Sequence, residues 1–194
     1  MTRIGYAARQ QFVDDELLRM PMVADHVFDA TWRALQDALP GLGPHERSIV
    51  AELLQVGMPA RRRMVERFVQ SVRDQVAAEL AGAAPAAVPA AAPAPALGLS
   101  LLDEEEIAAD VETSRAIEAI KSVADHELRE MATFTSALAG DPDVSRDHNP
   151  FRAETYARAM WEAVLALPLS KCYQAHLMRH AAQPLAQVLR KVYA

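Results

Sequence analysis

The sequence predicts an all-α protein built from two small helical units joined by a tether. Apolar residues recur at steps of three and four over most of the chain, and no segment alternates as a strand would. Between Leu80 and Leu102 no residue is charged, and four prolines stand among alanines there. We therefore expect an N-terminal three-helix unit over residues 1–80, an Ala/Pro-rich linker over 81–98, and a C-terminal helical bundle over 99–194 whose first helix is long.

The first unit is predicted to contain three helices separated by proline and glycine. The first helix covers about 22–39 and follows a short helix that Pro21 ends. The second begins at Pro44 and ends at Gly57, and Pro59 opens the third. This third helix has the cleanest helical period in the chain, with an apolar stripe at Val65, Phe68, Val69, Val72, Val76 and Leu80.

The second unit is predicted to begin with one very long helix. Asp103 can cap this helix, and Glu106 stands three residues later, as in a capping box. Because no proline or glycine follows until Gly140, the helix should run to about Leu138, roughly 50 Å at 1.5 Å per residue. Its apolar stripe consists of Ile107, Val111, Ile117, Ile120, Ala124, Leu128, Met131, Phe134 and Leu138.

Two further helices are predicted after a polar loop that ends at Pro150. Pro168 separates these helices, and the last one should begin near Ser170 and kink at Pro184. The inward-facing residues of the first of the two are predicted to be Ala157, Met160, Trp161, Val164 and Leu165.

Charge and cysteine content disfavour several classes of protein. The net charge is −6, and acidic residues predominate in the second half, which does not suit binding to a phosphate backbone. Cys172 is the single cysteine, so an internal disulfide and a cysteine zinc cluster are excluded. The window 80–102 is long enough to span a bilayer, but its prolines would break a lipid-exposed helix. With no apolar leader at the N-terminus, we expect a cytoplasmic protein without a membrane span.

One polar segment, residues 141–149, resembles a calcium-binding loop. An EF-hand loop requires glycine at its sixth position and glutamate at its twelfth. Arg146 and Arg152 stand at those positions. We therefore predict a capped polar turn there and no calcium site.

A second candidate lies on the last helix, where His176 and His180 are four residues apart and Cys172 precedes them by four. This spacing can bind zinc, but the glutamate of the H-E-x-x-H motif is replaced by Leu177. We predict a partly buried, hydrogen-bonded face with a buried structural thiol. We accordingly predict no catalytic residue, no cofactor and no metal, and no enzyme activity.

The dense basic patch of the chain consists of Arg61, Arg62, Arg63, Arg67 and Arg73. It falls at the start and along the polar face of the predicted third helix. Because positive charge at a helix N-terminus opposes the helix dipole, these arginines are expected to have a partner. Acidic neighbours such as Glu66, or the acidic second half, could be that partner. Nucleic acid is the alternative, and it would make the chain a nucleic-acid-binding module.

The stretch Leu99-Ser-Leu-Leu-Asp-Glu-Glu-Glu-Ile107 resembles a signature of a bacterial family known as domain of unknown function 1631. The resemblance continues through the long helix, the loop ending in Asn149-Pro150-Phe151, and the final helix with Pro184-Leu185. Family members are much longer, so the resemblance covers only their N-terminal part. It implies no catalytic residues and no cofactor.

Members of this family are often labelled thymidine phosphorylase. Phosphorolysis needs a phosphate site, which is commonly a glycine-rich loop or a helix N-terminus. The chain has 7 glycines and contains neither G-x-G-x-x-G nor G-K-[ST]. We therefore do not expect this activity.

Our functional hypothesis is a non-catalytic module for protein–protein interaction or regulation. The long helix offers more apolar length than its neighbours should cover, so a protein partner or self-association is expected. Met131 and Phe134 are the positions predicted to contribute, and replacing both with lysine should break the association.

Overall fold

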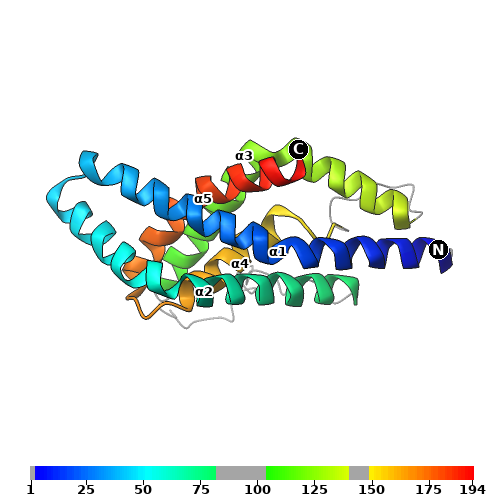
Figure 1. Cartoon of the computed structure of the whole chain (residues 1–194), viewed down its shortest axis with the longest axis horizontal. Coiled ribbons are helices and arrows are strands. Elements are labelled where there is room, and N and C mark those ends of the chain that lie inside the picture. The colour runs from blue at the N-terminus through cyan, green and yellow to red at the C-terminus, as the bar shows by residue number, and fades with distance from the viewer. Residues whose placement is uncertain (1–2, 82–103, 140–148) are drawn as a thin grey trace, which may run out of the picture.

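The computed structural model describes residues 3–81, 104–139 and 149–194, and every regular element in them is helical. The elements are α1 (Arg3–Ala38), the short 3-10 helix η1 (Leu39–Gly41), α2 (Pro44–Leu80), α3 (Glu104–Ala139), α4 (Ala153–Leu165) and α5 (Lys171–Tyr193). Figure 1 shows α1 and α2 as a long antiparallel pair, with α3 and α5 alongside α1. The predicted all-α fold is confirmed.

The first half of the chain forms two long helices, so the prediction of three shorter ones is wrong. Pro21 lies inside α1, and Gly57 and Pro59 lie inside α2. Both prolines are exposed, so the carbonyls that lose a hydrogen bond can be solvated. Buried residues continue with helical period on both sides of each proline, and burial of that stripe outweighs the cost of the missing bond.

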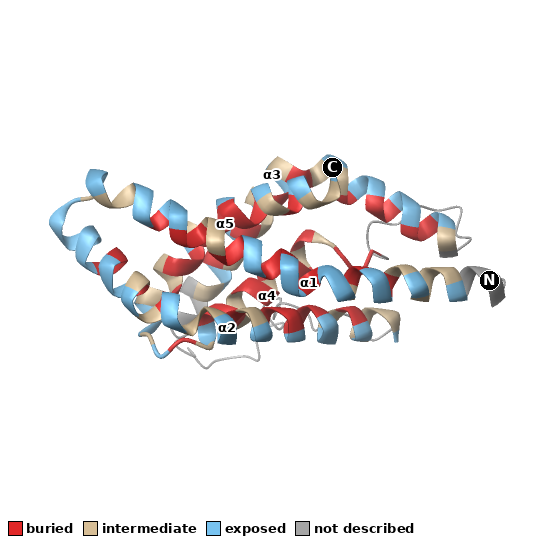
Figure 2. Cartoon of the chain, in the orientation of Figure 1, coloured by how far each residue is buried: buried red, intermediate tan, exposed pale blue. Residues whose placement is uncertain are grey.

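Helices from both sides of the predicted linker share one hydrophobic core. Packing of α1 against α5 and α3, and of α2 against α4, joins the two halves. Phe28 on α1 meets Phe68 on α2 edge to face at 6.2 Å. Figure 2 places the buried residues along the inward faces of these helices. The domain division at 81–98 stays a prediction, because residues 82–98 lie outside the described part of the chain.

The long helix predicted after Asp103 is present as α3, which runs from Glu104 to Ala139. Its backbone departs from helical geometry at Ala124, where φ is −123° and ψ is 19°. Ile120, Leu128 and Met131 of its predicted stripe are buried. The inward placement predicted for three further residues is wrong, because Val111, Phe134 and, on α4, Leu165 are exposed.

The last turn of α5 is held by a tyrosine pair, in which Tyr156 is buried and Tyr193 is partly buried. The hydroxyls of Tyr156 on α4 and Tyr193 on α5 are 2.6 Å apart. Burial, together with the neighbouring Tyr193, raises the pKa of Tyr156 well above 10, and burial raises the pKa of Tyr193 in the same direction. The pair therefore fixes the last turn of α5 as long as both hydroxyls keep their protons.

We expect stability to fall as the pH rises above about 10, the ordinary pKa of tyrosine. The unfolded chain then loses tyrosine protons that the folded chain retains, so the contribution is intact below that pH and lost as pH rises toward the folded pKa values. Each tyrosine should contribute a slope of about 1.4 kcal/mol per pH unit. Tyr193→Phe should reduce the slope of unfolding free energy between about pH 9 and 11, measured by urea titration. An unchanged slope would contradict this role.

Candidate interaction surfaces

The predicted basic patch lies on the exposed side of α2. Because α2 is continuous, Arg61, Arg62 and Arg63 occupy the middle of the helix. The expectation that they crowd a helix N-terminus is therefore wrong, and no dipole argument applies to them. Arg67 and Arg73 follow further along α2 and are both exposed.

Three of these arginines are paired with carboxylates of the same chain. Arg61 binds Asp29 at 2.7 Å and Asp25 at 3.0 Å, both on α1. Arg62 binds Glu66 at 2.9 Å and Arg67 binds Glu162 at 2.6 Å. The two kinds of partner suggested by the sequence, a helix neighbour and the acidic second half, are thus both present.

Arg63 and Arg73 make no ion pair with the described residues. Arg63 lines an open groove of about 640 Å³ between α2 and α4, next to the Arg67–Glu162 pair. Since Glu66 and Glu162 line the same groove, the charge of this surface is largely balanced.

The two apolar positions predicted to bind a partner lie in different environments. Met131 is 8% exposed and belongs to the core, whereas Phe134 is 51% exposed. The ring of Phe134 meets Phe12 of α1 edge to face, with centroids 5.2 Å apart. The ring of Phe12 in turn packs edge to face against the buried Phe151, with ring centroids 6.2 Å apart. We call Phe12 and Phe134 the aromatic surface; of the predicted pair, only Phe134 can meet a partner without unfolding.

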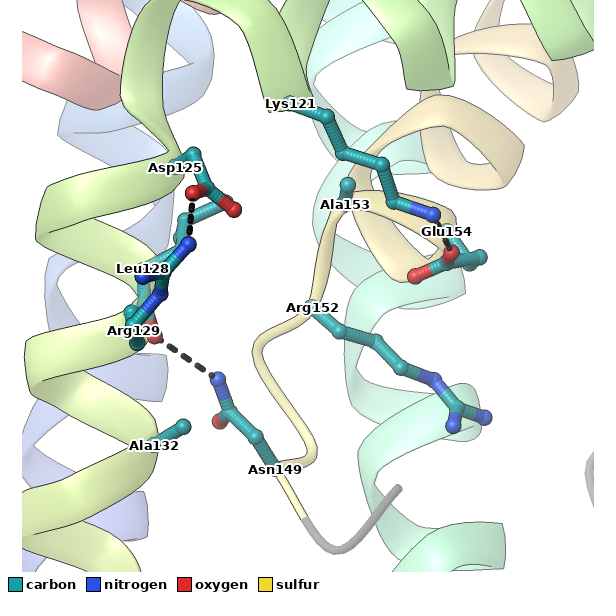
Figure 3. Close-up of a pocket in the computed structure, with 9 residues that line it drawn as sticks. All are labelled: Lys121, Asp125, Leu128, Arg129, Ala132, Asn149, Arg152, Ala153 and Glu154. Carbon is teal, nitrogen blue, oxygen red and sulfur yellow. Dashed lines mark hydrogen bonds and ion pairs between the residues drawn. The ribbon is translucent and has the colours of Figure 1, made fainter. Parts of the chain in front are cut away.

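A pocket of about 250 Å³ lies between α3 and the start of α4. Figure 3 shows two ion pairs on its walls, Arg129 with Asp125 on α3 and Lys121 with Glu154 on α4. Lys121 Nζ is 2.6 Å from Glu154 Oε1. Burial disfavours the charged form of Glu154, but the hydrogen bond from Lys121 and nearby positive charge lower its pKa below the ordinary value.

Asn149 forms part of the wall of this pocket and is buried. Its Oδ1 accepts the backbone N–H of Phe151 at 3.0 Å, and its Nδ2 donates to the carbonyls of Phe151 and Leu128. Arg152 extends away and binds Glu79 of α2 at 3.0 Å. The charged groups around the pocket are therefore paired within the protein. The pair of Lys121 with Glu154 links α3 to α4, and the pair of Arg152 with Glu79 links the start of α4 to α2. The rest of the calcium-like segment, residues 141–148, lies outside the described residues.

The zinc-like residues on α5 do not form a metal site in the part of the chain described here, where no group of three suitable ligands occurs. Cys172 is exposed, so the prediction of a buried thiol is wrong. The last helix begins at Lys171, and the first two residues of the helix, Lys171 and Cys172, are both exposed. His180 is half-buried, and burial with the neighbouring His176 and Arg179 lowers its pKa.

The described residues form an all-α fold with a shared core, largely paired arginines on α2, and an aromatic pair in which Phe134 is exposed and Phe12 is partly buried. No described helix has the length and apolarity to cross a bilayer. The chain belongs to the family described as protein of unknown function (DUF1631), N-terminal domain, whose model matches residues 21–194. This confirms the family that the sequence resembled. No curated protein and no solved structure matches the chain.

Proposed function

We propose that this domain is a non-catalytic helical module that binds another protein through the aromatic surface. The observation that supports the proposal is the half-exposed ring of Phe134 resting on Phe12. Aromatic residues are enriched at the centres of protein interfaces, whereas most solvent-facing positions of a helix are polar. Covering the exposed part of such a side chain contributes about 1–2 kcal/mol by area.

The surroundings of Phe134 support a preformed site. Phe12 contacts both Phe134 and the buried Phe151, and Met131 is buried on the preceding turn of α3. A ring held on a packed base loses little conformational freedom when a partner covers it. Nucleic-acid binding has less support, because the carboxylates paired with Arg61, Arg62 and Arg67 already neutralise much of that face.

The proposal is tested with Phe134→Lys and, as a matched control, Val111→Lys. Val111 lies on the same helix and is 42% exposed. Each tagged chain is used to capture proteins from nuclease-treated lysate of its own host, with mass spectrometry as the readout. We expect a stoichiometric partner that the control retains and that Phe134→Lys captures at least about ten-fold less, a change of about 1.4 kcal/mol in binding.

Circular dichroism and the melting temperature establish that both variants are folded. If folded Phe134→Lys captures the same proteins in the same amounts as the parent chain, the proposed role of the aromatic surface is wrong.

A further inference from the structure

α5 stops at Tyr193, whereas α3, the helix on which it packs, continues further. Figure 1 shows α5 and α3 running in the same direction, and Arg179 of α5 contacts Glu112 of α3 at 2.6 Å. An equal advance along both helices brings the end of α5, at Tyr193, level with about residue 126 of α3. From there α3 continues to Ala139, roughly 20 Å at 1.5 Å per residue. α3 therefore extends past the last turn of α5.

Phe134 lies on this extension of α3, beyond the non-helical backbone at Ala124. Before Ala124, Glu112 binds α5 directly and Val123 packs against the core. Beyond it, the ring of Phe134 meets Phe12 of α1 and remains half-exposed. The exposed ring therefore lies on the part of α3 that continues after its helical partner α5 has ended.

Acidic side chains lie between the end of α5 and Phe134. Glu127 and Glu130 fall on the same side of α3, since they precede Phe134 by seven and four residues. Glu127 makes no ion pair with the described residues, and Glu130 has only His126 at 3.4 Å, which is charged only when protonated. On α1, the exposed Asp15 stands three residues after Phe12. Because Arg9 stands three residues before Phe12, charge on α1 is mixed, and the acidic flank of the aromatic surface is on α3.

We propose that the aromatic surface receives an amphipathic helix with lysine or arginine beside its apolar face, lying along α3 where α5 ends. This inference rests on the proposed function and specifies the chemistry of the partner. A helix is the occupant that the site favours, because the preceding part of α3 already packs against a helix, α5. Apolar residues at helical spacing would cover Phe134 and Phe12, and the basic residues would pair with Glu127 and Glu130.

Two synthetic 18-residue helical peptides test this inference. They share one leucine face and differ only in carrying lysine or glutamate on its flanks, and each is titrated with the full chain by fluorescence anisotropy. We expect the lysine peptide to bind at least ten-fold tighter than the glutamate peptide. Phe134→Ala should weaken binding of the lysine peptide at least ten-fold. The double variant Glu127→Gln with Glu130→Gln should weaken its binding several-fold and make the affinity less dependent on salt. Val111→Ala should leave the affinity unchanged.

Equal affinity for the two peptides, or lysine-peptide binding that Phe134→Ala does not change, overturns the inference. A concentration-dependent dimer of the parent chain that Phe134→Ala abolishes overturns it in favour of a second copy as the occupant. If the lysate partner depends on Phe134 but the lysine peptide does not bind, the proposed function stands and this inference falls. If neither partner nor peptide depends on Phe134, both fall.

Discussion

Met131→Lys lowers the free energy of unfolding by about 3–5 kcal/mol, the range measured for uncompensated buried charges. Met131 is 8% exposed, and its neighbours Leu128 and Ala132 are also buried. A lysine at this position would have to place its ammonium among these apolar side chains or displace the helix to reach solvent. Urea denaturation at neutral pH measures the change.

Phe134→Lys is the control for this prediction, because position 134 already faces solvent. We expect it to change the free energy of unfolding by less than about 1 kcal/mol. The two positions, which sequence analysis grouped as one interaction site, should thus separate into a core residue and a surface residue. Similar losses of stability for both variants would contradict this separation.

Gly57→Ala should also destabilise the protein, although alanine is the better helix former. A Cβ at position 57 would overlap Cη2 of Trp32 and lie 3.0 Å from two more atoms of the same ring. Trp32 is 5% exposed, so making room for the new methyl group would require its indole to shift within the packed contact between α1 and α2. Overpacking of this kind costs about 1–3 kcal/mol, and a contact this close belongs at the upper end. After a helix-propensity gain of about 1 kcal/mol, a net loss of about 2 kcal/mol is expected.

Gly41→Ala is the matched control, because a Cβ there meets nothing within 4 Å. Chemical denaturation should place it within about 0.5 kcal/mol of the parent chain. In a Trp32→Phe background, Gly57→Ala should lose most of its cost, because the indole that it meets is gone. An equal cost of Gly57→Ala in both backgrounds would show that the close approach is not its cause.

The contact between Gly57 and Trp32 also shows which parts of the fold could be predicted from the sequence and which could not. Helical period alone identified α3 and the buried stripe of α2 at Phe68 and Val72, because these depend only on the spacing of apolar residues. The continuity of α2 through Gly57 and Pro59 could not be predicted in this way. The glycine there lets α2 approach Trp32 of α1 closely. The stabilising contacts come from tertiary packing between residues far apart in the sequence, which local helix propensity does not report.

The candidate site was predictable only in part for the same reason. Periodicity placed Met131 and Phe134 on one apolar stripe but could not say where the covering helix ends. Burial of Met131 and exposure of Phe134 depend on the tertiary packing around the distal part of α3, including where α5 stops, at Tyr193. The pairing of Arg67 with Glu162 likewise joins residues far apart in the chain. The acidic second half hinted at such a partner, but the individual residue emerged only from the packing of α2 on α4.

Photo-crosslinking from position 134 tests the central claim most directly. A benzoylphenylalanine at position 134 keeps an aromatic ring on the surface, and the same residue at position 111 serves as a control on the same helix. Irradiation of host cells followed by mass spectrometry identifies what each position contacts. The proposed function predicts a discrete protein adduct at position 134 that is absent at position 111. No adduct at position 134, or the same adducts at both positions, would contradict it.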